Sequence, residues 1–224
     1  MLENLFPINL NLRGRKCLVV GGGRVAERKV SSLLQCGAEI WIVSPKLTEK
    51  LGKLIKEDKI NFAGTHYETE HLQDCALAIS AVDDTSVNSK VADECFTRNI
   101  PVNVVDDPER CSFTVPSVLR RGSLCITVST DGKSPLLSRR IRETLENSFG
   151  PEYAEFLDLM GEIRSRVIRD VPDIEKRRKI FQCLIGSDIL ELLRQDIEKK
   201  EGGGNISHDL RRIIEERVAQ CMSS

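Results

Sequence analysis

The sequence lacks three features that would direct the chain to a nucleic acid, a membrane or the secretory route. Its 33 Lys and Arg residues balance 34 Asp and Glu residues, so the formal net charge is only −1. A nearly neutral protein has no general attraction for nucleic acid or anionic lipid, and we expect neither as a partner. No run of about 18 apolar residues and no basic-then-apolar leader occurs, so we predict a cytoplasmic protein without a membrane span.

The chain also lacks the cysteine and histidine spacing that is typical of a metal site. None of its 8 cysteines forms a C-x-x-C pair, and the 3 histidines, His66, His71 and His208, are scattered. We therefore expect no standing metal site and interpret the cysteines as reduced, small hydrophobic residues. The cysteines are Cys17, Cys36, Cys75, Cys95, Cys111, Cys125, Cys183 and Cys221.

What is present, over residues 1–112, is a regular alternation of strand-like and helix-like segments. Short β-rich apolar runs alternate with segments in which apolar residues recur at helical spacing. This order predicts a Rossmann-like, doubly wound parallel sheet of the α/β class. The expected strands are 16–20, 39–43, 76–81 and 101–107, and the expected helices cover 25–34, 47–55 and 87–96.

The pattern changes beyond residue 110. CSFTVP and SLCITVS read as two strands that flank a basic turn, Arg120-Arg121-Gly122. A helix follows, with Ser134 placed to cap it and Pro135 at its first position. We therefore expect a small α+β unit for dimerisation and substrate binding over 113–149, a helical unit over 150–200, and a glycine-linked tail over 201–224. The last segment, DLRRIIEERV, reads either as a short amphipathic helix or as a loose tail.

A glycine turn stands between the first strand and the first helix. Gly21, Gly23 and Ala26 form G-x-G-x-x-A, which serves either as a purely structural turn or as the cradle of a dinucleotide. In the second case Gly23 lets a pyrophosphate approach the backbone, and the helix N-terminus faces the phosphates. The cofactor contacts that we predict in this turn are Gly21, Gly22, Gly23, Arg24 and Val25.

The acid that usually holds the ribose at the end of the second strand is missing. Ser44 and Pro45 occupy that place, and Glu39 lies at the wrong end of the strand. Ser44 is able to hydrogen-bond a ribose hydroxyl, whereas Lys46 is able to meet a 2′-phosphate. NAD is the predicted cofactor, and the choice between NAD and NADP stays open at this point.

Four separate stretches resemble one family. GGGRVAERK, AVDDTSVN, PVNVVDDPERCSFTVPS and ITVSTDGKSPLLSRRIRETLE are similar, in order and spacing, to the dehydrogenase and chelatase module of siroheme synthase. The resemblance covers roughly residues 1–200. It implies a homodimer that oxidises precorrin-2 to sirohydrochlorin with NAD⁺ and, in some members, inserts Fe²⁺ to give siroheme; Co²⁺ is an alternative metal. Only a short tail follows Lys200, so we expect no methyltransferase activity.

The resemblance and the strand pattern both point to Asp106 as the acid/base group. It matches the aspartate that ends the N-V-V-D strand of the family, and the carboxyl ends of parallel strands face the ligand crevice. The alternative is that Asp106-Asp107-Pro108 only turns the chain. For Asp107 the turn is the better interpretation.

The resemblance places further contacts along the chain, and each has a plain structural alternative. Asn88 and Asn103 match family positions near the cofactor, but local hydrogen bonding also explains them. Asp83 either contacts the cofactor or, with Asp84, initiates a helix, and Ala81 is expected at the floor of the crevice.

A local basic cluster suits a substrate that carries many carboxylates. The alternative, for any single arginine, is a solvated helix surface. Ser129 and Thr130 match family positions that face the substrate. The predicted substrate contacts are Ser129, Thr130, Lys133, Arg139 and Arg120, with Arg121, Arg140 and Arg142 in the same cluster.

Two other functions remain open. One is a dehydrogenase that leaves metal insertion to another protein. The other is a non-catalytic NAD(H)-sensing module, which explains the glycines but leaves the D-D-P turn and the basic helix without a task.

Overall fold

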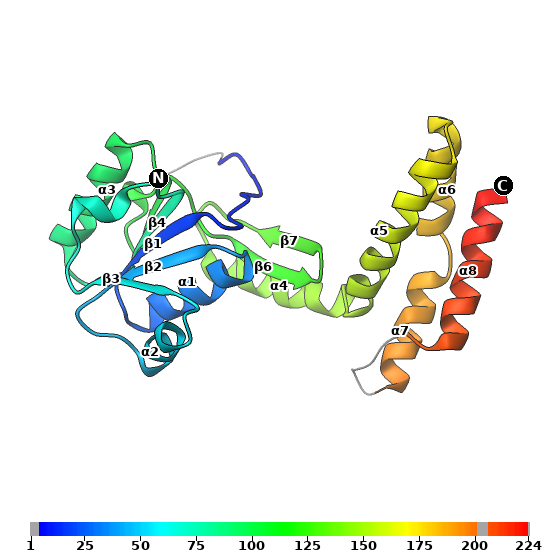
Figure 1. Cartoon of the computed structure of the whole chain (residues 1–224), viewed down its shortest axis with the longest axis horizontal. Helices are drawn as coiled ribbons and strands as arrows, with labels where there is room; N and C mark the ends of the chain where they lie inside the picture. Colours follow the sequence, from blue (N-terminus) through cyan, green and yellow to red (C-terminus); the bar gives the residue numbers. More distant parts are fainter. Residues whose placement is uncertain (1–4, 201–205, 224) are drawn as a thin grey trace. The chain divides into compact units, whose positions relative to one another are not determined.

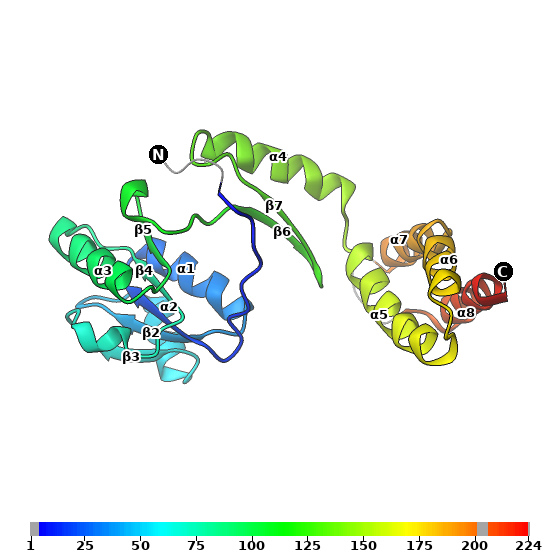
Figure 2. The same ribbon diagram turned by 90° about the horizontal axis from the view of Figure 1, so that it is seen from above.

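The structure is a computed structural model that describes residues 5–200 and 206–223 (Figures 1 and 2). It divides into two compact units, Met1–Val115 with Asp131–Lys133, and Pro116–Thr130 with Ser134–Ser224. The first break thus falls three residues beyond the expected end of the sheet domain. The second unit joins the segments that we expected as an α+β unit, a helical unit and a tail.

The first unit has the predicted doubly wound parallel sheet. Its strand order is β3-β2-β1-β4-β5, with every pairing parallel, so the chain reverses direction across the sheet between β1 and β4. Strand β3 was not predicted, because Asn61 and Gly64 dilute its apolar pattern. The elements are β1 (Lys16–Val20), α1 (Arg24–Gln35), β2 (Glu39–Val43), α2 (Glu49–Lys56), β3 (Asn61–Gly64), η1 (Thr69–Leu72), β4 (Leu77–Ser80), α3 (Thr85–Thr97), β5 (Val102–Val104) and η2 (Pro108–Arg110).

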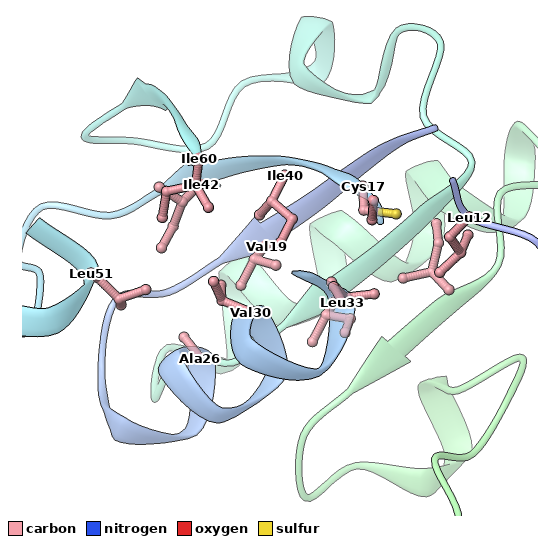
Figure 3. Close-up of a cluster of buried hydrophobic side chains, with 13 residues drawn as sticks. Leu12, Cys17, Val19, Ala26, Val30, Leu33, Ile40, Ile42, Leu51 and Ile60 are labelled. Atoms are coloured by element: carbon pink, nitrogen blue, oxygen red, sulfur yellow. The ribbon is translucent and has the colours of Figure 1, made fainter. Parts of the chain in front are cut away.

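Alternate residues of the strands enter two separate cores, one on each face of the sheet. On one face Ala26, Val30 and Leu33 of α1 pack on Val19, Ile40 and other strand residues (Figure 3). On the other face α3 and η1 cover the intervening residues, such as Leu18 and Val20. Burial on both faces explains why these strands read as continuous apolar runs.

The second unit contains an antiparallel hairpin followed by helices. Ser134 caps α4 as predicted, since its Oγ accepts a hydrogen bond from the Leu137 N–H at 3.3 Å. The elements are β6 (Ser117–Arg121), β7 (Leu124–Val128), α4 (Pro135–Ser148), α5 (Glu152–Asp170), α6 (Ile174–Ile185), α7 (Ile189–Lys199) and α8 (His208–Ser223). None of the helices in the described residues is long and apolar enough to cross a lipid bilayer.

Two expectations about the hairpin were wrong. CSFTVP is not a strand: Ser112 is joined to Val102 through its backbone N–H and its hydroxyl, and no ladder follows. The basic residues Arg120 and Arg121 end β6, and the turn itself is Gly122-Ser123, with Gly122 at φ +54°. Glycine suits that turn because its backbone is left-handed.

Of the two interpretations of the chain end, the amphipathic helix is confirmed and the loose tail is wrong. The interpretation of all cysteines as reduced was also wrong. Helix α8 buries Leu210, Ile214 and Val218 in the core that it shares with α5, α6 and α7. A disulfide joins Cys183 of α6 to Cys221 of α8. The predicted glycine linker, 202–204, lies outside the described residues.

Candidate functional site

An open pocket of about 610 Å³ lies at the carboxyl ends of β1, β2 and β4. Strands β1 and β4 are the neighbours between which the chain order reverses, and this is where open α/β sheets bind ligands. The pocket is lined by Gly21, Gly22, Gly23, Arg24, Val25, Ser44, Pro45, Lys46, Leu47, Thr48, Ala81, Val82 and Asp83. Nine of the eleven predicted cofactor contacts are therefore brought together in one place.

The three glycines of the turn have different physical roles. Gly21 has φ +117°, and a Cβ on it would overlap the backbone oxygen of Ala81. A Cβ on Gly22 would overlap the backbone oxygen of Lys46, so this glycine lets the loop after β2 touch the turn. At Gly23 a Cβ would have no atom within 4 Å. Protein atoms thus require the first two glycines, and the space at the third is open to a ligand.

Helix α1 begins at this turn without a side-chain cap. Its N-cap residue is Gly23, whereas Thr48 and Asp84 cap α2 and α3, the other α-helices described in the same unit, with their side chains. The first N–H groups of a helix need an acceptor, and an anion beside them also interacts favourably with the helix dipole. An uncapped start beside open space therefore fits the diphosphate of a dinucleotide.

The loop after β2 is folded against the glycine turn. The Ser44 hydroxyl donates to the backbone oxygen of Lys46 at 2.6 Å, and the Thr48 N–H donates to the backbone oxygen of Gly22 at 3.0 Å. Ser44 is buried, while Pro45 and Lys46 are exposed at the pocket. The donor proton of Ser44 is used inside the loop, which weakens our expectation that it binds a ribose.

Two of the predicted contacts are held inside the protein. The Asn88 side chain accepts from Ser80 Oγ at 2.7 Å and donates to the Val82 backbone oxygen at 3.0 Å. Asn103 is buried, and its Nδ2 donates to the Phe113 backbone oxygen at 3.1 Å. Neither residue lines the pocket; Asn88 holds Val82, which does line it, whereas Asn103 holds Phe113, which does not.

Of the two aspartates after β4, one caps a helix and one faces the pocket. Asp84 accepts from the Ser86 N–H at 2.8 Å and caps α3. The same bonds lower the pKa of its carboxyl, with the Ser86 hydroxyl as the largest cause. Asp83 is exposed and lines the pocket.

Asp106 follows β5 in a left-handed turn, with φ +60°, and its side chain is exposed. Strands β4 and β5 are in register at Ser80 and Val104, and the Val105 N–H donates to the Ser80 backbone oxygen at 2.9 Å, so the chain leaves the sheet at Asp106, just beyond the end of β4. Asp107 is paired with Arg110 at 2.9 Å. Asp106 is thus at the carboxyl edge of the sheet, and β4 lies between its strand and the strand that leads into the glycine turn.

Lys29, a half-buried residue of α1, was not among the predicted site residues. Burial, followed by the positive charge of Arg28, lowers the pKa of its amine, while Cys111 and Asp106 oppose that shift. The Lys29 amine therefore lies within the electrostatic reach of Asp106. The helical spacing predicted α1 itself, but it gave no sign that a lysine on this helix lies near Asp106.

The predicted substrate residues are spread over both units. Lys133 belongs to the first unit, and the other four belong to the second. Thr130 Oγ1 accepts from the Ser134 N–H at 3.1 Å, which leaves its proton available to a ligand. Arg139 is paired with Glu143 at 2.8 Å, and Arg142 is paired with Glu146. Ser129 is exposed, and Arg120 lies on β6.

Two family models match adjoining parts of the chain. One is described as "Putative NAD(P)-binding" and covers residues 8–117, and the other as "Sirohaem biosynthesis protein central" and covers residues 121–148. The chain belongs to the siroheme synthase family. This assignment agrees with the resemblance that the sequence motifs indicated.

Relatives in the siroheme synthase family are similar over most of this chain. The siroheme synthase of Methylobacillus flagellatus is 40% identical over 188 residues, which are 82% of this chain and 40% of the relative. That of Thioalkalivibrio sulfidiphilus is 39% identical over 189 residues, 84% of this chain and 39% of the relative. This chain therefore spans about two fifths of the length of these curated relatives.

A solved structure covers the chain more fully. The structure named "SirC, precorrin-2 dehydrogenase" is 25% identical, with a TM-score of 0.68, and the match covers 96% of this chain and all of that one. In the described part of this chain, no group of three or more His, Cys, Asp or Glu residues is arranged to hold a metal ion.

Proposed function

We propose that this protein oxidises precorrin-2 to sirohydrochlorin with NAD⁺ in siroheme biosynthesis. The observation that carries the proposal is the open space at Gly23, directly beside the uncapped start of α1. A purely structural turn has no need of a third glycine there. The two matched family models and the likeness to a precorrin-2 dehydrogenase support the same reaction.

The bound nicotinamide supplies the hydride acceptor of this reaction. The residues of the chain hold it: the N–H groups of the first turn of α1 bind the diphosphate, and Ala81 leaves room at the β4 side of the pocket. Removal of two hydrogens from precorrin-2 delivers a hydride to NAD⁺ and also releases a proton. Asp106 accepts that proton, since its exposed carboxylate lies at the carboxyl edge of the sheet.

We assign the substrate's carboxylates to the hydroxyl and cationic groups of the central segment. Thr130 has a free proton to donate, and Ser129 is exposed beside it. Lys133 and Arg120 supply positive charge. Arg139 must exchange Glu143 for a substrate carboxylate, which costs little because that pair is exposed to solvent.

The partner of the second unit is a second copy of the chain. Leu136 is 77% exposed, and Leu137, Ile141 and Val118 are also exposed. Three of these side chains lie on α4, which contacts both strands of the hairpin and buries only Ser138. Apolar side chains that stay exposed together on one helix are typical of an oligomer contact, so we propose a cytoplasmic homodimer through this face.

Insertion of Fe²⁺ into sirohydrochlorin is the second candidate reaction, and Co²⁺ is an alternative substrate metal. Pyrrole nitrogens lose protons as a metal enters, and Asp106 serves as their acceptor too. Measurement of Fe²⁺ and Co²⁺ insertion into purified sirohydrochlorin separates a bifunctional enzyme from a dehydrogenase that leaves metal insertion to another protein.

The decisive experiment incubates the full chain with enzymatically generated precorrin-2 and NAD⁺ and follows the absorbance of NADH and sirohydrochlorin. The absorbance of NADH and that of sirohydrochlorin should rise together. Gly23→Asp should abolish the reaction and NAD⁺ binding, because its carboxylate occupies the place of the diphosphate. A protein that binds NAD⁺ but leaves both spectra flat is the NAD(H)-sensing module instead.

A further inference from the structure

The end of β2 offers no acid to a ribose. Sites selective for NAD place a carboxylate there to bind the 2′-hydroxyl. In this chain the first residue after β2 is Ser44, whose hydroxyl donates to the backbone oxygen of Lys46 at 2.6 Å and accepts from the Lys46 N–H at 3.3 Å. The hydroxyl therefore stabilises its own loop, and its proton is not available to the ribose.

Neighbouring acids do not take over this task. Glu27, in the first turn of α1, accepts from the Thr48 hydroxyl at 2.7 Å and pairs with Lys50 at 3.5 Å. Among the residues that line the pocket the single acid is Asp83, and it follows β4 rather than β2. The ribose side of the pocket consequently carries no negative side chain that would repel a phosphate.

Two cations line the same pocket. Lys46 stands in the loop after β2, and Arg24 is the first residue of α1; both are exposed. Within residues 5–200 and 206–223 the structure records no salt bridge to either side chain. Their charge is thus available to an anionic ligand.

The backbone that carries Lys46 is fixed in place. Its oxygen lies so close to Gly22 that a Cβ there would overlap it, and the Thr48 N–H donates to the Gly22 oxygen at 3.0 Å. The lysine therefore starts from a defined point beside the glycine turn. A fixed starting point reduces the entropy lost when the side chain binds a ligand.

We propose that Lys46 and Arg24 bind the 2′-phosphate of an NADP-type dinucleotide, so that the site accepts NADP⁺ as well as NAD⁺. The inference rests on the proposed function only for the presence of a dinucleotide in this pocket. It requires no change in the reaction, because both dinucleotides carry the same nicotinamide.

The test measures binding of NAD⁺ and NADP⁺ to the full chain by isothermal titration calorimetry, without substrate. We expect both to bind, with NADP⁺ affinity falling more steeply with salt because of its additional charge. Lys46→Glu should weaken NADP⁺ binding by at least about ten-fold, since repulsion replaces a charge-assisted hydrogen bond to the phosphate, and should not weaken NAD⁺ binding, since a carboxylate is able to accept from a ribose hydroxyl. Arg24→Gln should also weaken NADP⁺ binding, by a smaller factor than Lys46→Glu does.

Lys56→Glu is the matched control. It reverses an exposed cation on the neighbouring helix α2 that does not line the pocket and has no salt bridge recorded among the described residues, so NADP⁺ affinity should change by less than about two-fold. NAD⁺ binding without NADP⁺ binding, or an unaltered NADP⁺ affinity in Lys46→Glu, overturns this inference and leaves the proposed function standing. If neither NAD⁺ nor NADP⁺ binds, both this inference and the proposed function are overturned.

Discussion

The two units of this protein use their polar side chains differently. In the first unit, residues at the pocket and at the sheet edge leave charged groups unused: among the described residues no salt bridge is recorded to Lys46 or Arg24, and Asp106 is exposed on a left-handed turn. In the second unit, charged side chains join helix to helix. Arg194 of α7 pairs with the buried Glu152 of α5, and Arg217 of α8 pairs with Asp188 at 2.9 Å.

This difference indicates that the unpaired groups of the first unit serve ligand binding, whereas the paired groups of the second unit stabilise its helical core. Groups that must bind or exchange a ligand stay unpaired at the ends of strands, where the sheet holds the loops in position. Groups that join helices are satisfied by one another and by a disulfide. Substitutions at the pocket should therefore change binding or rate at constant stability, and those in the bundle should change stability at constant binding.

Asp106→Asn provides the largest expected effect and the sharpest test of the first unit. Asparagine tolerates the left-handed backbone at φ +60°, so the turn is preserved while the proton acceptor is lost. We expect kcat for precorrin-2 oxidation to fall by about 10²- to 10⁴-fold. NAD⁺ affinity and the melting temperature should stay constant. Full activity would identify Asp106 as a turn residue only.

Cys183→Ser tests the second unit. The disulfide to Cys221 spans 38 residues, a loop for which chain entropy predicts a stabilisation of about 4 kcal/mol. The free energy of unfolding, followed by circular dichroism of the helices, should drop by that order under oxidising conditions and change much less with a reductant. NAD⁺ affinity should be unaffected.

Cys125→Ser is the matched control for the disulfide, because it removes an unbonded thiol from the same unit. The difference in the free energy of unfolding between Cys125→Ser and the wild type should be the same with and without reductant. If the loss of unfolding free energy in Cys183→Ser were also the same with and without reductant, the disulfide would not contribute to the stability of the bundle.

The buried thiols of the first unit predict a loss of stability at high pH. Burial is the main reason why the pKa of Cys17 is raised to about 11 and that of Cys95 to about 12. Above the ordinary thiol pKa of 9.0 the unfolded chain releases protons that the folded chain retains, so stability falls as pH rises from there toward 11. The contribution of Cys17 is about 2 kcal/mol.

Trp41 of β2 is the single tryptophan of the chain and reports on the first unit. Denaturant unfolding followed by its fluorescence should show a smaller decrease between pH 8 and pH 11, roughly, in Cys17→Ala than in the wild type. An identical decrease in both proteins would show that the Cys17 thiol does not set the alkaline limit.

Arg139→Gln should have the smallest effect on stability. Its pairing with Glu143 is an exposed contact one helical turn apart, and solvent screens such pairs so strongly that they contribute little to stability. A lower apparent affinity for precorrin-2 at unchanged stability would assign Arg139 to the substrate. An unchanged KM for precorrin-2 would show that Arg139 is only a solvated residue of the helix surface.

Several features of the first unit followed from the sequence because they depend on local spacing. The strand at 16–20, the helix that ends before Gly37 and the glycine turn between them are encoded within about twenty residues, and the structure confirms their order. The cap at Ser134 was equally local. Strand β3 was missed because a short edge strand gains its stability from pairing with β2 rather than from its own residues.

The role of each polar residue did not follow in the same way. Asn88 and Asn103 match cofactor positions of the family, yet their amides hold Val82 and Phe113 in place. Whether an amide serves a ligand or the backbone depends on which carbonyl the fold brings beside it. The pairing of Cys183 with Cys221 has the same origin, since the two sit on different helices that only packing brings together.

The sequence by itself determined the alternation of strands and helices, the glycine cradle and the acid that follows the fifth strand, because each is written in neighbouring residues. Only the tertiary structure decided which polar side chains stay available to a ligand at the pocket and which are bound to other groups of the protein. Hydrogen bonds and burial depend on atoms that are distant in sequence, so they become fixed only when the chain is packed.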